Sequence, residues 1–173
     1  MEQAKLDKIL DNHKLWLQTS GEQGERANLR SADLSYADLR SADLRSADLS
    51  YADLRSADLR YADLSYADLR YANLRSADLS SADLRSADLR SADLSSADLR
   101  SADLDFSAFP LWCGGLDVNI DDKQATQLLY HLVRNVQYSK NTSGEMKKLC
   151  KLKSIIKKAN EFHRVNECGV IKG

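Results

Sequence analysis

The sequence predicts a β-solenoid, a chain that coils around a leucine-lined core, with helical segments before and after it. Leu occupies every fifth position from Leu29 to Leu104, sixteen times in all. Ala stands two residues before each Leu, from Ala27 to Ala102. Such unbroken repetition is the signature of an array of stacked units. Pro110 then ends the array.

Neither regular element can bury a five-residue period. In a helix with about 100° per residue, the Leu side chains would advance by a net angle of about 140° per repeat and form no apolar stripe. In a flat strand, where side chains alternate between faces, an odd period would place successive Leu on opposite faces. A chain that turns once per five residues instead points both Ala and Leu inward in every repeat, while Asp, Arg, Ser and Tyr point outward.

The run of A-[DN]-L-x-x units resembles the pentapeptide-repeat family over about half of the chain. The resemblance implies a right-handed quadrilateral β-helix, in which four repeats close one square coil and Leu is the central inward residue. Counting a degenerate last unit at Ser107, seventeen units would make about four coils. The expected core comprises Leu29, Leu34, Leu39, Leu44, Leu49, Leu54, Leu59, Leu64, Leu69, Leu74, Leu79, Leu84, Leu89, Leu94, Leu99, Leu104 and Phe109.

Residues 1–26, before the repeats in residues 27–110, are expected to form a helix and a linker that cap the first coil. A stacked solenoid has raw edges, which terminal caps protect. Gly21 suits the end of the helix, and His13 is expected to be a packing residue rather than a ligand. The side chains expected to face the coil are Leu6, Ile9, Leu10, His13, Trp16 and Leu17.

Residues 111–173 are expected to form a helical segment that caps the solenoid or joins two copies in a homodimer. A helix is predicted from Asp121 or Asp122 to about Ser139, with a further helical stretch from Glu145 that breaks near Lys151. Terminal helices often mediate dimerisation in the family that the chain resembles. The predicted apolar stripe of the first helix comprises Leu128, Leu129, Leu132, Val133 and Val136.

Charge is unevenly distributed along the chain, although the net charge is only −1. Residues 27–109 carry ten Arg and fifteen Asp, whereas residues 110–173 carry eleven basic and six acidic groups. Some proteins of the family that the chain resembles mimic DNA and occupy the DNA groove of type II topoisomerases such as gyrase. Stacked Asp could carry such mimicry, or could instead support the turns. The acidic candidates for partner binding are Asp53, Asp58, Asp63 and Asp68.

Tyrosines and lysines provide two further candidate binding surfaces. Tyr51 and Tyr71 are twenty residues apart and are expected to stack, and together with Tyr66 they are candidate interface anchors. Tyr also suits any β surface. Lys147, Lys148 and Lys151 could contact nucleic acid or an acidic partner, or could simply form a solvated face.

No motif for catalysis or cofactor binding is evident in the sequence. It contains no nucleophile elbow, P-loop or dinucleotide-binding glycine motif. The spacing of Cys113, Cys150, Cys168 and His163 matches no usual zinc site. We therefore expect no enzyme, metal, cofactor or small-molecule substrate. The lack of a secretory signal and of a long apolar run predicts a protein of the cytoplasm with no membrane contact.

The sequence thus favours a non-enzymatic scaffold or protein-interaction module, expected to be a homodimer. A DNA-mimic modulator of a type II topoisomerase is the alternative. Binding of nucleic acid through the basic helices is a weaker alternative.

Overall fold

The structure, a computed structural model of the chain, describes residues 1–108, 118–138, 143–149 and 153–160. The chain forms two compact units, Met1–Ile120 and Asp121–Gly173. The first contains helix α1 (Gln3–Gln18) and the repeats. The second contains α2 (Asp122–Tyr138), α3 (Gly144–Leu149) and α4 (Lys153–Ala159).

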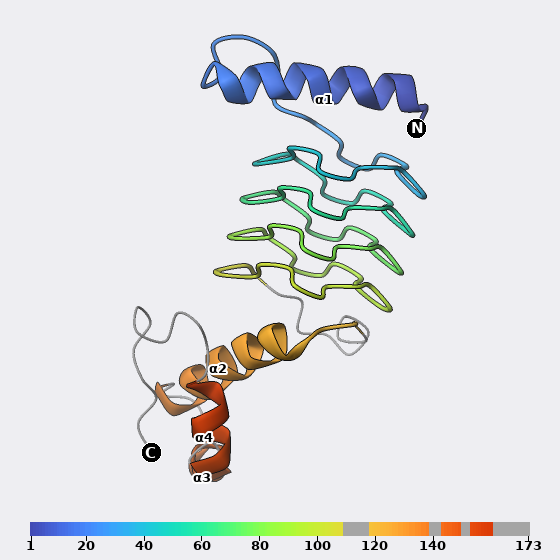
Figure 1. Cartoon of the computed structure of the whole chain (residues 1–173). Helices are drawn as coiled ribbons and strands as arrows, with labels where there is room; N and C mark the ends of the chain where they lie inside the picture. The colour runs from blue at the N-terminus through green and yellow to red at the C-terminus, as the bar shows by residue number, and fades with distance from the viewer. Residues whose placement is uncertain (109–117, 139–142, 150–152, 161–173) are drawn as a thin grey trace. The chain divides into compact units, whose positions relative to one another are not determined.

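The repeats form a stack of coils joined by parallel backbone bridges (Figure 1). Each bridge within the repeats links residues twenty positions apart, beginning with Asn28 and Asp48. The Leu29 N–H donates to the Asp48 carbonyl at 2.7 Å, and the Asp48 N–H donates to the Ala27 carbonyl at 3.0 Å. Each coil therefore takes four repeats, and neighbouring coils satisfy one another's backbone groups.

The core of the solenoid consists of the repeated Leu and Ala side chains. All sixteen Leu from Leu29 to Leu104 are buried, and none is more than 4% exposed. Burial of one Leu side chain contributes about 1.5–3 kcal/mol, so the sixteen Leu together supply most of the hydrophobic stabilisation of the solenoid. Ala32, Ala37 and Ala42 of the first coil are only half-buried. Phe109, the last expected core residue, lies outside the described residues.

Each repeat turns at a corner closed by one backbone hydrogen bond. In the first repeat, the Ala32 N–H donates to the Leu29 carbonyl at 3.1 Å, and the corner residue Ser31 has a φ of 55°. Positive φ at the third residue of a four-residue turn is characteristic of type II turns, which usually place Gly there. Here Ser, Tyr or Phe occupies this position in every repeat, with φ from 54° to 61°.

Helix α1 lies across the open end of the first coil, as the sequence predicts (Figure 1). Leu6 is buried, and Ile9 and Leu10 pack against the same leucine core. The helix ends where Ser20 takes a φ of 53° and the Gly21 N–H donates to the Trp16 carbonyl at 2.8 Å. This backbone bond satisfies a carbonyl at the helix end.

A short segment after the repeats covers part of the last coil. Asn119 forms a parallel bridge with Asp98, donates its N–H to the Ala97 carbonyl, and accepts the Leu99 N–H, both at 2.7 Å. Val118 and Ile120, on either side of Asn119, pack against the leucine core. The first unit therefore extends to Ile120, ten residues beyond the end of the repeat segment defined from the sequence.

The second unit is helical. Its α2 begins at a reciprocal cap, in which the Gln124 N–H donates to Asp121 Oδ1 and the Asp121 N–H donates to Gln124 Oε1, both at 3.2 Å. Tyr130 and Val133 are buried in a cluster with Leu129, Val136, Ile155 and Ile156.

Leu132, which the sequence places on the apolar stripe, is instead 60% exposed. The cluster is built from α2 and α4 residues on the Tyr130 and Val133 side, which leaves Leu132 away from the packed face. The break expected near Lys151 lies outside the described residues, between the end of α3 and the start of α4.

Candidate interaction surface

The acidic residue before each Leu caps the turn of its own repeat. In all sixteen repeats, Oδ1 of the Asp or Asn accepts the backbone N–H of the residue two positions later, at 3.0–3.4 Å. Asp and Asn favour such local turns because their short side chains reach nearby backbone donors. Asp has a structural role at this position in every coil where it occurs.

Arg or Ser engages the same carboxylates from within the repeat. Arg70 is typical: its Nε donates to Oδ1 of Asp68 at 2.8 Å and its Nη2 to Oδ2 at 2.6 Å. This two-pronged bond lowers the pKa of Asp68 below its ordinary value. Seven other repeats hold an Asp–Arg pair of this kind. In five repeats a Ser hydroxyl donates to the Asp instead.

The structure does not bring the four acidic candidates together. Asp53, Asp58, Asp63 and Asp68 belong to successive repeats, and the bridges place each of them in a different column. Three of the four are paired with the Arg of their own repeat, while Asp63 bonds to Ser65.

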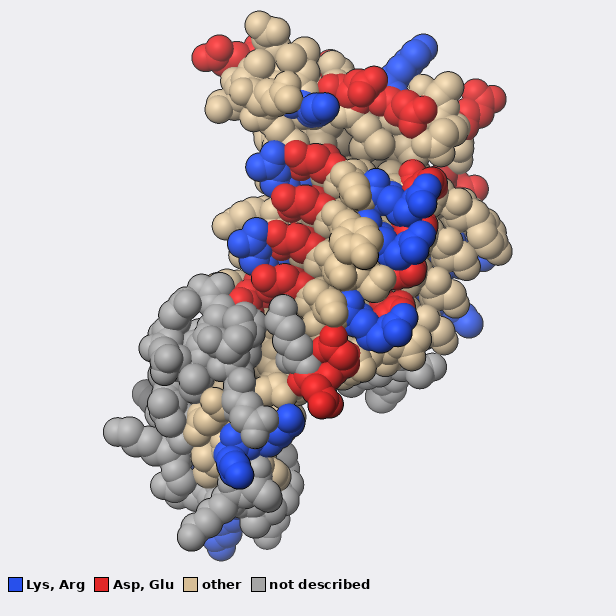
Figure 2. All heavy atoms as spheres, viewed as in Figure 1, with Lys and Arg blue, Asp and Glu red and all other residues tan. Residues whose placement is uncertain are grey.

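One column concentrates negative charge. Bridges link Asp43, Asp63, Asp83 and Asp103 on a single side of the solenoid. The outward positions of the same repeats hold only two Arg, at 45 and 85, together with Ser65 and the buried Asp105. Figure 2 shows acidic atoms in columns, with basic atoms beside them, on the face in view.

Tyr51 and Tyr71 stack on one corner of the solenoid, as the twenty-residue spacing predicts. Their ring centroids are 4.8 Å apart with an interplanar angle of 11°. The Arg30 guanidinium lies over the other face of Tyr51, 4.7 Å from the ring centre, a favourable cation–π position. We call Arg30, Tyr51 and Tyr71 the Tyr ladder. Tyr51 is 48% exposed and Tyr71 is 54% exposed.

Arg30 was not among the residues expected at this corner. The residue that could have indicated its place is Asn28, because a neutral amide offers no carboxylate to hold the Arg30 guanidinium within its own repeat. Arg30 Nη1 instead donates to the Ser50 hydroxyl at 2.8 Å. Tyr66, the third tyrosine candidate, is not in the ladder: it lies in the column of Ser86 and Phe106.

The lysine candidates lie in the second unit. Lys147 is half-buried and Lys148 exposed in α3, whereas Lys151 lies outside the described residues. Lys157 and Lys158 of α4 are exposed.

Within the described ranges, no group of His, Cys, Asp and Glu could hold a metal ion. The three cysteines and His163 lie outside those ranges. None of the described helices is long and apolar enough to cross a membrane.

The family model for pentapeptide repeats matches the chain in eight copies, over residues 25–60, 37–75, 57–95 and 67–105. The chain belongs to the pentapeptide-repeat family. Members of this family are right-handed quadrilateral β-helices. No curated protein matches the chain in sequence.

Solved structures of other pentapeptide-repeat proteins resemble the chain. HetL of Nostoc sp. strain PCC 7120, involved in the regulation of heterocyst differentiation, is 39% identical with a TM-score of 0.42. The match covers 55% of this chain but only 45% of HetL. A thylakoid-lumen protein of Arabidopsis thaliana is 27% identical, with 69% of this chain and 89% of that protein covered and a TM-score of 0.47. QnrB1, a plasmid-mediated fluoroquinolone resistance protein, is 21% identical, with 65% and 75% covered and a TM-score of 0.23.

Proposed function

We propose that this chain is a non-enzymatic scaffold that binds a partner protein through the Tyr ladder. The observation that carries the proposal is the stack of Arg30, Tyr51 and Tyr71, held in place yet about half exposed. Tyr and Arg are enriched among the residues that dominate binding energy at interfaces. A side chain that is already ordered loses less conformational entropy on binding.

The charged surface between the corners supports the same proposal. Most outward Asp side chains are bonded within their own repeat, so a partner must compete with those bonds to use them. On the described repeats, the aromatic corners are therefore the surface that a partner can contact with the smallest loss of existing hydrogen bonds.

Quantitative cross-linking with mass spectrometry tests the ladder. Wild type is compared with a Tyr51→Ala/Tyr71→Ala variant and with a matched Tyr36→Ala/Tyr61→Ala control, which removes two exposed but unstacked rings. A partner that is lost from the ladder variant and kept by the control is the expected result. Equal recovery by all three proteins contradicts the role of the ladder.

We further propose that the helical second unit joins two copies into a homodimer. The exposed Leu132 on α2 is an apolar side chain available for such a contact. Light scattering should give a dimer for the full chain and a monomer for residues 1–120, a truncation that keeps the Val118–Ile120 segment on the last coil. Monomers in both cases would leave the second unit as a cap only.

Modulation of a type II topoisomerase by DNA mimicry is the alternative. The column of Asp43, Asp63, Asp83 and Asp103 favours it, although Arg45 and Arg85 compensate part of its charge. A DNA duplex carries one charge per about 1.7 Å without such compensation. No inhibition of gyrase supercoiling at micromolar protein would exclude mimicry. A true mimic should lose inhibition on Asp63→Asn/Asp83→Asn.

Nucleic-acid binding by the basic helices is the weaker alternative. It predicts that a Lys148→Gln/Lys157→Gln/Lys158→Gln variant loses duplex affinity with a reduced salt dependence, because each phosphate contact releases counterions. Equal binding by wild type and this variant would reject it. A cytoplasmic location, expected from the sequence, stays a prediction.

A further inference from the structure

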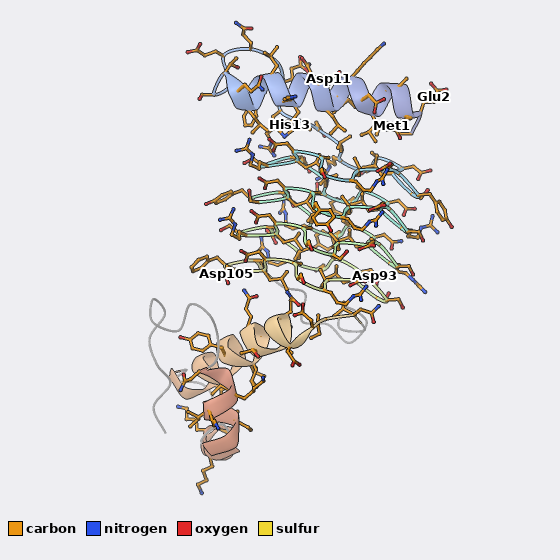
Figure 3. The ribbon with its side chains drawn as sticks, viewed as in Figure 1. Met1, Glu2, Asp11, His13, Asp93 and Asp105 are labelled. Carbon is orange, nitrogen blue, oxygen red and sulfur yellow. The ribbon has the colours of Figure 1, made fainter. Side chains whose placement is uncertain are left out.

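One titratable side chain is buried where α1 meets the first coil. His13 is fully buried, and its Nδ1 accepts the N–H of Ala27, the first residue of the repeats, at 3.0 Å. Figure 3 shows His13 on the side of α1 that faces the coils. The other contacts of α1 with the core come from Leu6, Ile9 and Leu10, which do not change with pH.

The bond from Ala27 requires an unprotonated Nδ1, so the imidazole is neutral in the closed cap and carries its proton on Nε2. Protonation would turn Nδ1 into a donor that faces the donor of Ala27 only 3.0 Å away. Among the described residues, Nε2 makes no hydrogen bond in the closed cap. A charged His13 is therefore disfavoured in the closed cap, because its buried Nδ1–H would face the Ala27 N–H without an acceptor.

The charged groups around His13 do not reverse this preference. Burial lowers its pKa below the ordinary value, and this is the largest effect. The Asp43 carboxylate and a contact with the Arg45 backbone oppose this lowering of the pKa, whereas the charges of the Arg26 and Arg45 side chains add to it. On its own helix, the ring of Trp16 stacks against the imidazole at 5.6 Å. The surroundings thus contain one acid and a backbone contact that favour the imidazolium, against burial and two basic side chains that disfavour it.

We propose that His13 is an acid-sensitive latch, whose protonation releases α1 from the first coil and uncovers the end of the leucine core. The direction of the pH effect on cap closure follows from the linkage between protonation and opening. The opened cap binds a proton more readily than the closed one, so closure is favoured above the ordinary histidine pKa and weakens as the pH falls below it. With an ordinary pKa of about 6.5, the opening constant should rise by up to about 30-fold between pH 7.5 and pH 5.0.

The repeats should stay folded over the same range. Carboxylates such as Asp68 have pKa values below their ordinary range, so their bonds to Arg persist at pH 5.0. Release of α1 is therefore separable from unfolding of the solenoid.

Hydrogen exchange of the α1 amides, corrected for the intrinsic pH dependence, tests the latch on the full chain. The control is His13→Gln, whose amide oxygen can accept the Ala27 N–H at any pH. Wild type should show the full increase in opening at pH 5.0, and His13→Gln less than about 3-fold, while the amides of the coils stay protected in both. An equal increase in both proteins, or none in wild type, would overturn the proposal.

An NMR titration of the His13 ring provides the second measurement, independent of whether the Gln variant caps well. The latch requires a midpoint below about 6.5 that coincides with loss of α1 protection. A midpoint at the ordinary value with α1 still protected would overturn it.

Discussion

Replacing Asp68 separates the two roles of the repeated acid, capping the turn and pairing with Arg. Asp68→Ala removes the acceptor of the Arg70 N–H and both bonds to the guanidinium. The lost backbone bond costs about 1 kcal/mol. The ion pair adds at most about 1 kcal/mol, because the Arg70 side chain is 42% exposed. The expected loss of stability is therefore about 1–2 kcal/mol.

Asp68→Asn is the matched control, since an amide keeps the acceptor and loses only the charge. The chain already contains this arrangement: Oδ1 of Asn28 and Oδ1 of Asn73 accept their turn N–H at 3.2 and 3.3 Å. Asp68→Asn should therefore cost about 0.5 kcal/mol, the typical worth of an exposed ion pair.

Urea unfolding followed by circular dichroism measures both variants. Urea is preferable to guanidinium chloride, whose ions would screen the pair. Midpoints should fall in the order wild type, Asn, Ala, with unchanged slopes. Equal losses for Asn and Ala would refute the reasoning, because stability would then come from the charge and not from the turn cap.

Three further predictions test the cap, the corners and the acid stability. Gly24→Ala should loosen α1, because Gly24 has a φ of 73° and an added Cβ would lie 2.3 Å from the Asn12 carbonyl oxygen. Faster proteolysis of the helix measures this loosening. Gly144→Ala, whose added Cβ would meet nothing within 4 Å, is the neutral control. Ser86→Val should lower stability by about 1–2 kcal/mol or more in urea unfolding, since the corner φ of 57° suits a β-branched residue poorly, whereas Ser86→Gly should change it by less than about 1 kcal/mol. The Arg40 guanidinium lowers the pKa of Asp38 to about 2. Asp38 should therefore contribute stability above its ordinary pKa of 3.8, and this contribution is lost as the pH falls through about 2. Over this range the Tm of the wild type should decline more than the Tm of Asp38→Asn.

The elements with many repeated signals were predictable from the sequence. The five-residue period places every Leu in the core, and the helical spacing of Leu6, Ile9 and Leu10 places α1 on the first coil. In both cases a pattern of several residues points to one buried face, so single ambiguous positions do not matter.

The features that depend on individual residues were harder to predict. Val118–Ile120 pairs with the last coil without any repeat signal. Asp53 and Asp58 were both candidates for partner binding, yet a coil of four repeats places neighbouring repeats on different sides of the solenoid. Grouping by twenty-residue spacing, as for Tyr51 and Tyr71, identifies the side chains that meet.

The same spacing explains why departures from the repeat, more than the repeat itself, create distinct surfaces. Arg and Ser alternate after each Leu with a fifteen-residue period, which is out of step with the twenty-residue coil. Ser therefore moves from side to side, and like charges do not accumulate as full Arg columns. Against this averaged background, one neutral residue has a local effect: Asn28 leaves Arg30 unpaired with a carboxylate, and the guanidinium moves onto Tyr51. An Asn28→Asp change should draw Arg30 back to its own repeat and leave the stacked tyrosines without their cation. This single substitution therefore tests whether recognition by the corner requires the Arg30 guanidinium.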